Sequence, residues 1–529
     1  MSNIAKDLLF DTKARTKLLE GIEIVAKAVG ESLGPKGKNT AIYEAWGSPI
    51  ITHDGVTISN AIVLPDLFQD MGAKLIKEAA QKTSDKAGDG TSVTTILTHA
   101  IVKEALQNIQ AGANPMTLKK EIEDSLQIAL QELDKLKKEI KTDEEIESIA
   151  TISSADPEKG KLVAEAFKKV GNEGIITVED GKKIETTVEY KQGMEIDRGY
   201  LSPYFVTNQE TVEAIIEDPY ILLTDKKINY AREILPFIER FVQVSKNLVI
   251  FCGECVEEGM AFLVVNHLKG NIKVVAVQAP AYGDRRAEEL QDIGILTGGT
   301  PILEDSGRQL ESVQVEELGR AEKVIVNRDK TIIVNGAGDA SGRMEELRKQ
   351  LKLANTDYDK QIKEQRLAKL AGSVAVINIG AASDVEMKEK RKRFINAINS
   401  TKSAVSDGVV AGGEITLLKL AKGKTVQIGD AKLTYSTPGS KIFLEALKAP
   451  FIQLVTNAGL DYAEVREKMA GKDYPFGVDV NDGQVKDLIV AGVIDPVRVV
   501  RSALENSVSV ATMIMTCNSL ITDIPKEDK

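Results

Sequence analysis

The chain has 529 residues, too many for one hydrophobic core, so roughly two to four domains are expected. Its composition, 43% hydrophobic and 28% charged, is that of an ordinary soluble globular protein, and no apolar stretch is long enough to cross a bilayer. A net charge of -11 without a concentrated basic stretch argues against nucleic acid as the main partner. The N-terminus lacks the pattern of a signal peptide, so the expected location is the cytoplasm.

The first elements are a helix, a glycine-rich loop and a short strand. Apolar residues recur at helical spacing over residues 12–33. The segment 32–39 then stops this helix, because glycine followed by proline cannot continue it. Residues 50–52 predict a strand that runs into an acidic turn at Asp54. Asp54 is thus one carboxylate that could serve as a base or a metal ligand.

Residues 88–95 are the most informative stretch in the chain. Two glycines flank Asp89, and the hydroxyl residues Thr91 and Ser92 open a helix. The free N–H groups of a first helical turn attract anions, most often phosphate, and Asp89 could hold a metal ion. Taken alone, this octet is equally consistent with a capped helix after a glycine turn. Together with the first loop and Asp54 it predicts a nucleotide site.

Two other glycine motifs do not predict nucleotide loops. The Gly-Lys-Thr of residues 423–425 has Leu418 where a P-loop needs its first glycine. The glycine segment 336–342 follows a predicted strand, but its third glycine comes one position late for a dinucleotide loop. We interpret it as a strand-to-helix turn.

The rest of the chain is organised in nested parts. Residues 192–374 alternate short apolar runs with helical segments, an α/β pattern. Within them, residues 231–245 carry an apolar stripe at helical spacing, which is usually core. The basic run 388–393 is interpreted as a solvated helix face. Cys252 and Cys255 form a CxxC that could be a redox pair, although incidental cysteines are the simpler reading and further zinc ligands are lacking.

Ordered blocks along the whole chain resemble those of the group I chaperonins, the bacterial GroEL type. The likeness runs from about residue 4 to about residue 525. The blocks that carry it are residues 33–39, Asp54-Gly55-Val56, 87–91, 179–181, 197–205, 282–286, 409–413 and Ile494-Asp495-Pro496.

This resemblance implies a multi-domain α and α/β chaperonin fold with three domains. Residues 1–135 and 407–529 would form a helical equatorial domain that binds ATP. Residues 136–191 and 375–406 would form a small mixed intermediate domain with the hinges, and residues 192–374 an α/β apical domain that binds substrate. The family assembles as heptameric rings that pair back to back. It folds unfolded protein clients inside a cavity with a GroES-type co-chaperonin.

The resemblance also implies which residues bind the nucleotide. The cofactors would be ATP and Mg²⁺, with K⁺ as a further candidate ion. Asp89 would hold the metal, and Asp54 would act at the attacking water. The residues that would contact the nucleotide are Ser32, Leu33, Gly34, Pro35, His53, Asp89, Gly90, Thr91, Ser92, Val93, Gly413, Asp479 and Asp495.

This site departs from the family pattern at several positions. Asn396 stands where the family has a second catalytic aspartate, and an amide cannot take a proton. His53 replaces a lysine, Val93 a threonine and Glu414 a glycine. The sequence ends without the Gly-Met-rich tail that is common in the family. Two functions therefore stay open: a folding ATPase, or a paralogue that binds ATP but hydrolyses it poorly and acts as a holdase, scaffold or ring partner. Neutral drift with compensation elsewhere would also produce these changes.

A client-binding face is implied on the apical domain. Chaperonins bind unfolded chains through exposed apolar surface, which is unusual on a soluble protein. The family positions fall on Tyr200, Tyr204, Phe205, Leu235, Ile238, Met260, Val264 and Val265, all of which are apolar or aromatic.

Overall fold

The computed structural model describes residues 6–43, 49–140, 142–154, 156–171, 174–181, 183–209, 211–353, 357–422, 426–428, 431–433 and 436–523. Contacts within the chain divide it into two compact units. Unit 1 joins the two ends of the chain, Met1–Glu165 and Gly380–Lys529, and unit 2 is Ala166–Ile379. The division into three domains stays a prediction. No helix in the described part of the chain is long and apolar enough to span a membrane.

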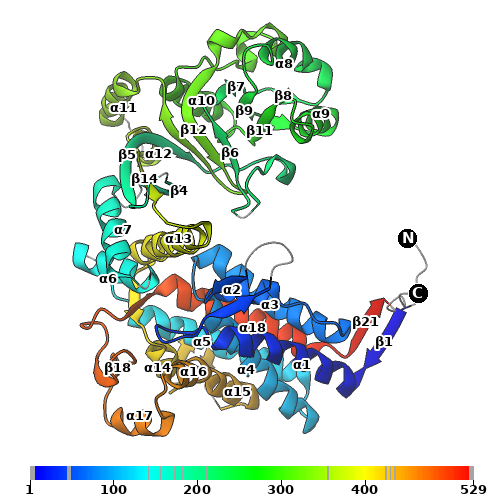
Figure 1. Ribbon diagram of the computed structural model, residues 1–529, viewed down its shortest axis with the longest axis vertical. Helices are drawn as coiled ribbons and strands as arrows, with labels where there is room; N and C mark the ends of the chain where they lie inside the picture. The colour runs from blue at the N-terminus through cyan, green and yellow to red at the C-terminus, as the bar shows by residue number, and fades with distance from the viewer. Residues whose placement is uncertain are drawn as a thin grey trace. The chain divides into compact units, whose positions relative to one another are not determined.

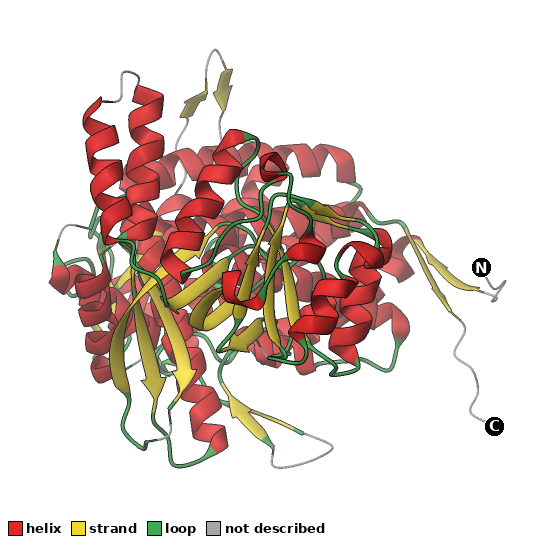
Figure 2. Ribbon diagram, turned by 90° about the horizontal axis from the view of Figure 1, so that it is seen from above, coloured by secondary structure: helices red, strands yellow, loops and turns green. Residues whose placement is uncertain are grey.

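Unit 1 is mainly helical (Figures 1 and 2). Its helices are α1 (Asp11–Gly30), α2 (Gly55–Ala61), α3 (Leu67–Ala87), α4 (Thr91–Gln110), α5 (Pro115–Leu136), α6 (Asp143–Ser154), α7 (Pro157–Val170, whose end passes into unit 2), α13 (Asp384–Asp407), α14 (Ile415–Ala421), α15 (Pro438–Ala446), α16 (Ala449–Asn457), α17 (Tyr462–Lys468) and α18 (Val497–Thr516). The predicted helix over 12–33 is confirmed as α1, which ends three residues earlier than expected.

Two-stranded antiparallel sheets border these helices. They are β1 (Lys6–Phe10) with β21 (Ser519–Asp523), β2 (Thr40–Ile42) with β3 (Ile50–Thr52), β15 (Val409–Ala411) with β20 (Ile494–Pro496), β16 (Val426–Ile428) with β17 (Ala431–Leu433), and β18 (Phe476–Asp479) with β19 (Gln484–Asp487). The pairing of β1 with β21 places the first and last described strands of the chain side by side, as both views show.

The core of unit 1 unites helices from both ends of the sequence. The C-terminal helix α18 contacts α3, α4 and α5, and its buried face consists of small and apolar residues such as Ala503 and Ala511. These small side chains let the helices approach closely. Side-chain caps begin two of the long helices, α3 and α5: the Asp66 carboxylate accepts the N–H of Phe68 at 2.9 Å, and Asn114 caps α5 in the same way.

Unit 2 is an α/β structure built on a nine-stranded sheet. The strand order is β11-β9-β7-β12-β13-β5-β14-β4, and β6 pairs with β12. The strands are β4 (Ile175–Asp180), β5 (Thr187–Ile196), β6 (Ala214–Glu217), β7 (Tyr220–Leu223), β9 (Asn247–Cys252), β11 (Lys273–Gln278), β12 (Gly319–Val326), β13 (Thr331–Gly336) and β14 (Ser373–Ile379). A short parallel pair, β8 (Lys227–Ile228) with β10 (Glu254–Cys255), lies beside it.

The helices of unit 2 are α8 (Leu235–Phe241), α9 (Glu257–Leu268), α10 (Asp284–Thr297), α11 (Ser341–Leu353) and α12 (Asp357–Leu370), with short 3₁₀ turns between elements. The predicted α/β alternation is confirmed, and residues 336–342 are the predicted strand-to-helix turn between β13 and α11. The apolar stripe of residues 231–245 forms a shorter helix than its spacing suggests. Pro236 lies in the first turn of α8, where a proline starts a helix and restricts the residue before it. Cys252 and Cys255 are free thiols in the core of this unit.

Candidate functional site

Segments that are far apart in the sequence meet at the N-terminus of α4. Gly90 precedes this helix with a φ of 85°, a left-handed conformation that suits glycine, and it brings no capping side chain. The N–H groups of the first turn are therefore available to an external acceptor. Thr91 and Ser92 add hydroxyl groups beside them. This is the geometry of an anion site.

The loop after α1 and the start of α2 lie against this helix start. The Ser32 Oγ is 3.4 Å from the Ser92 Oγ. A Cβ atom on Gly55 would lie 2.8 Å from the Ser92 Oγ and 2.9 Å from the Thr91 Oγ1, so the close approach of α2 requires glycine there. Asp54, the residue before Gly55, is thereby held next to the start of α4.

The Asp54 carboxylate is bound from two sides. Its Oδ2 accepts the N–H of Thr57 at 2.6 Å, which caps α2, and it accepts the Lys392 ammonium of α13 at 2.5 Å. Burial by itself would raise the pKa of Asp54, but the charge and hydrogen bond of Lys392, together with the bonds from Thr57, outweigh it and leave the pKa below its ordinary value. Asp54 is therefore a carboxylate anion at neutral pH.

Asp89 lies in the turn between α3 and α4. Its Oδ1 accepts the N–H of Gly90 at 2.6 Å, and its Oδ2 accepts the Ser400 hydroxyl of α13 at 3.4 Å. Burial raises the pKa of Asp89, and the nearby charge of Asp54 raises it further. A bound cation would stabilise the charged form of Asp89, since it would compensate the buried negative charge.

The C-terminal half of the sequence contributes two further carboxylates. The pairing of β15 with β20 sets Asp495 opposite Val410, and Gly413 and Glu414 follow β15 directly. Burial, followed by the charge of Asp89, raises the pKa of Asp495 to about 7. Burial also raises the pKa of Glu414 well above its usual range, and the charges of Asp495 and Asp89 add to the shift. Glu414 adopts a φ of 61°, a conformation that is strained for a residue with a side chain.

One face of α13 looks toward this carboxylate group. Lys392 contacts Asp54, and Ser400 contacts Asp89. Asn396 lies midway between these two residues at a spacing of four, so the three side chains share one helix face. The half-buried Asn396 therefore faces the region between the two aspartates.

The other predicted nucleotide residues are placed as follows. The Leu33 carbonyl accepts the Asn457 amide at 2.9 Å, and Gly34 and Pro35 continue as an exposed turn. His53 is half-buried, and burial and then the Arg393 charge lower its pKa. Val93 packs in part against the core of unit 1.

Asp479 ends β18 within a hairpin. Its Oδ2 pairs with the Lys486 ammonium at 2.7 Å, and its Oδ1 accepts the Asn481 N–H at 3.0 Å. Gly413 lies near this hairpin, because a Cβ on Gly413 would be 3.9 Å from the Val478 carbonyl oxygen. The contact of Asp479 with a nucleotide stays a prediction.

The donor set suits Mg²⁺ bound together with phosphate. Among the described residues, no three His, Cys, Asp or Glu side chains converge to form a complete metal site. Mg²⁺ is usually held by one or two carboxylates together with substrate phosphates and waters, rather than by an all-protein cage. Asp89 beside an open helix N-terminus supplies one carboxylate and leaves room for a phosphate, so these residues fit the group.

The second predicted site, the client-binding face in unit 2, is partly corrected. Tyr204, Leu235 and Val265 are 64%, 37% and 46% exposed, on adjacent elements around α8 and α9 (Figure 1). Tyr200, Met260 and Val264 are partly buried against the core. Phe205 and Ile238 are 0% and 5% exposed, so the prediction that they belong to an exposed face is wrong for this structure.

Phe205 and Ile238 are buried because they pack against neighbouring side chains of unit 2. Phe205 makes an edge-to-face contact with His267 of α9, with ring centroids 5.7 Å apart. Ile238 lies on the same side of α8 as Phe241, which is fully buried in the core. In both places the aromatic and apolar side chains bind α8 and α9 to the sheet, and only their neighbours reach the surface.

Two residues of the site were not identified from the sequence as such. Lys392 was interpreted as part of a solvated basic face, whereas it pairs with Asp54. Ser400 contacts Asp89. A signal for both was present, since Lys392 and Ser400 flank Asn396 at a spacing of four on one helix.

The raised pKa values predict a pH-dependent stability. A folded-state pKa of about 7 for Asp495, against an ordinary 3.8, means that stability is lost as the pH rises between these values. Glu414→Gln removes one member of the repelling group. We expect this substitution to raise the free energy of unfolding by on the order of 1 to 3 kcal/mol at pH 8 and by much less at pH 4. Denaturant unfolding curves recorded with a chelator present measure this difference. The exposed Glu467→Gln serves as control, and equal effects of Glu414→Gln at both pH values would contradict the prediction.

Comparison with known proteins identifies the family. The model of the TCP-1/cpn60 chaperonin family matches residues 25–525. Among solved structures, the chaperonin gp146 from the bacteriophage EL 2 (Pseudomonas aeruginosa), determined in the presence of ATP-BeFx, is similar at a TM-score of 0.72 and 19% identity. The match covers 97% of this chain and 98% of that chain. The chain therefore belongs to the TCP-1/cpn60 chaperonin family, with the chaperonin fold, and is a chaperone that assists the folding of other proteins.

Proposed function

We propose that this chaperonin binds MgATP at the N-terminus of α4 and uses it to fold clients in a ring. The open first turn after Gly90, with Asp89 beside it, is the observation that carries the proposal. Phosphate oxygens would accept the N–H groups of this turn and the hydroxyls of Thr91 and Ser92. The structurally similar gp146 was determined in the presence of ATP-BeFx, which supports a nucleotide as the ligand.

The charge distribution supports the metal. Asp54, Asp89, Glu414 and Asp495 approach closely enough to shift one another's pKa values. Phosphates would be repelled by these groups unless a cation came with them. Mg²⁺ held by Asp89 would neutralise phosphate charge, which is the main requirement of phosphoryl transfer. Calorimetric titration with ATP should therefore show binding that depends on Mg²⁺, and absence of binding would contradict the proposed function.

Hydrolysis is the step for which this site is least well equipped. Asp54 can orient and polarise a water, but Asn396, which faces the same region, has no negative charge and cannot take a proton. We propose that ATP turnover is slow in relation to ATP binding. A holdase, scaffold or ring partner without hydrolysis is the alternative, and the family match does not favour it.

Asn396→Asp tests this point. Because general-base help contributes roughly 10²–10⁴-fold, the substitution should raise steady-state ATP turnover of the purified assembly at least about tenfold. The exposed Asn271→Asp in unit 2 makes the same substitution away from this site and should change turnover little. Turnover of the unaltered chain at the level of ordinary chaperonins, or no response to Asn396→Asp, would refute slow hydrolysis.

Assembly into rings is supported by open sheet edges in unit 1. The pairs β1–β21 and β2–β3 are each two-stranded, so their outer edges are not covered by any other described strand of this chain. Leu8, Phe10, Ile51 and Ile521 expose large apolar side chains on these strands. An open strand edge with apolar side chains is a surface on which a second chain can add strands. We propose that copies of the chain join there.

A charge on this surface should weaken assembly. Ile521→Asp places a carboxylate among the exposed apolar groups, which would have to be desolvated in a joint between copies. We expect the assembly to dissociate at protein concentrations about tenfold higher than for the unaltered chain, in sedimentation velocity measurements. Ile184→Asp, at an exposed apolar position of unit 2, is the control. Equal behaviour of the two variants would rule out the proposed joint.

Clients would bind at Tyr204, Leu235 and Val265 on unit 2. These exposed apolar side chains surround α8 and α9, with Met260 and Val264 half-buried beside them. An exposed apolar face of this kind suits an unfolded chain. A GroES-type co-chaperonin would bind to the same face, and the cytoplasm would be the place of action.

Leu235→Glu tests the client face. Contact with an apolar client would then bury a carboxylate, so capture of an unfolded model client should weaken at least about tenfold, measured as suppression of its aggregation. Val490→Glu, at an exposed apolar position of unit 1, should leave capture intact. Undiminished capture by Leu235→Glu would show that the face has been assigned wrongly.

A further inference from the structure

Among the described residues of α13, Lys392 bonds directly to Asp54. Its Nζ donates to the Asp54 Oδ2 at 2.5 Å and also to the Thr57 hydroxyl of α2. The Lys392 side chain is 39% exposed and that of Asp54 is 15% exposed, so the pair lies at the open side of the site. The residues are 338 positions apart in the sequence, and the contact joins α13 to the start of α2.

The bond adds a second donor to one oxygen of Asp54. Oδ2 already accepts the Thr57 N–H at 2.6 Å as the cap of α2. With the Lys392 ammonium added, both lone pairs of Oδ2 are engaged, so a water would have to approach the other oxygen, Oδ1. A carboxylate engaged in this way is fixed in position and is a poorer proton acceptor.

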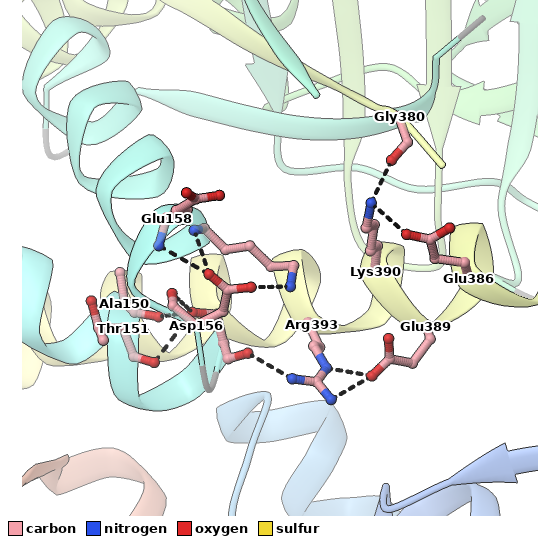
Figure 3. Close-up of polar contacts among 11 residues, drawn as sticks. Ala150, Thr151, Asp156, Glu158, Gly380, Glu386, Glu389, Lys390 and Arg393 are labelled. Atoms are coloured by element: carbon pink, nitrogen blue, oxygen red, sulfur yellow. Dashed lines mark hydrogen bonds and ion pairs between the residues drawn. The ribbon is translucent and has the colours of Figure 1, made fainter. Parts of the chain in front are cut away.

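Two neighbouring cations of α13, Lys390 and Arg393, contact other groups (Figure 3). Lys390 pairs with Glu386 at 2.8 Å and donates to the Gly380 carbonyl. Arg393 pairs with Glu389 and donates to the Ser154 carbonyl at 3.4 Å. Lys392 therefore contacts Asp54 because it lies on the helix face that also carries Asn396 and Ser400.

We propose that Lys392 is a positioning residue that restrains Asp54 and thereby sets the rate of ATP hydrolysis. This inference rests on the proposed function, in which Asp54 orients the attacking water. The ammonium fixes the orientation of the carboxylate and restricts that water to Oδ1, and its charge lowers the proton affinity of Asp54. Release of Lys392 frees Oδ2 from this bond and strengthens the base.

The charges around Asp54 determine the pH dependence. Asp54 faces Lys392 of α13, Asp89 of the α3–α4 turn and the adjacent His53, while Arg393 and Glu389 of α13 act on His53. Lys392 lowers the pKa of Asp54. The negative charge of Asp89 repels the negative charge of Asp54. Loss of the lysine therefore raises the pKa of Asp54, so turnover should fall off at a higher pH on the acid side.

The test is the kinetics of Lys392→Met in the full-length assembly with MgATP. We expect kcat to rise about three- to tenfold, KM to stay within about twofold, and the acid limb of the kcat profile to move to higher pH. Lys392→Arg keeps the positive charge, so its kcat and its pH profile should be closer to those of the unaltered chain than the values of Lys392→Met are. Lys390→Met removes a similar charge from the same helix without touching Asp54, and it should not move the acid limb.

Other outcomes separate this inference from the proposed function. An unchanged or lower kcat in Lys392→Met, with ATP bound, would overturn the restraint while leaving ATP binding in place. A raised KM with unchanged kcat would overturn it too, since it would mean that Lys392 binds the nucleotide. If the unaltered chain bound no ATP in the calorimetric titration, the proposed function itself would fail. The unfolding temperature of each variant shows whether a change in rate reflects the site or the fold.

Discussion

The burial of several like charges around one helix start is the constraint on which this structure depends. Asp89, Glu414 and Asp495 each have a raised pKa, because burial and mutual repulsion disfavour their charged forms. Such a group is unfavourable in the folded chain alone and becomes favourable with a cation, which in turn brings phosphate. Under the proposed function, this repulsion would disfavour a bare anion and favour a metal-bound one.

The core of unit 1 creates this group by joining the two ends of the sequence. Asp89 precedes α4, and Asp495 lies on β20 directly before α18, a helix that packs against α4. The β15–β20 ladder then fixes Asp495 beside the turn with Gly413 and Glu414. Apolar packing between α4 and α18 thus determines which charges meet. A change in the α4–α18 contact would move two carboxylates relative to each other.

Local chemistry explains what the sequence could predict. The helix over 12–33, the strand before Asp54 and the α/β alternation all follow from periodicity and glycine or proline breaks. The burial of Phe205 and Ile238 could not be predicted in this way, because a residue on an apolar stripe faces core or solvent according to the elements packed on it. The partner of Lys392 was likewise hidden, since a salt bridge across 338 positions leaves no local pattern.

The face of α13 that carries Lys392 and Asn396 is less acidic than the family pattern implies. That pattern has an aspartate at position 396, whereas this chain has a neutral amide and, one turn earlier, a lysine on the same face. Under the proposed function, the lysine charge would weaken a carboxylate that must polarise water, and the amide would supply no second carboxylate. Phosphate binding would depend instead on the N-terminus of α4, which neither residue caps. The residues at positions 392 and 396 would therefore act against hydrolysis and leave nucleotide binding in place.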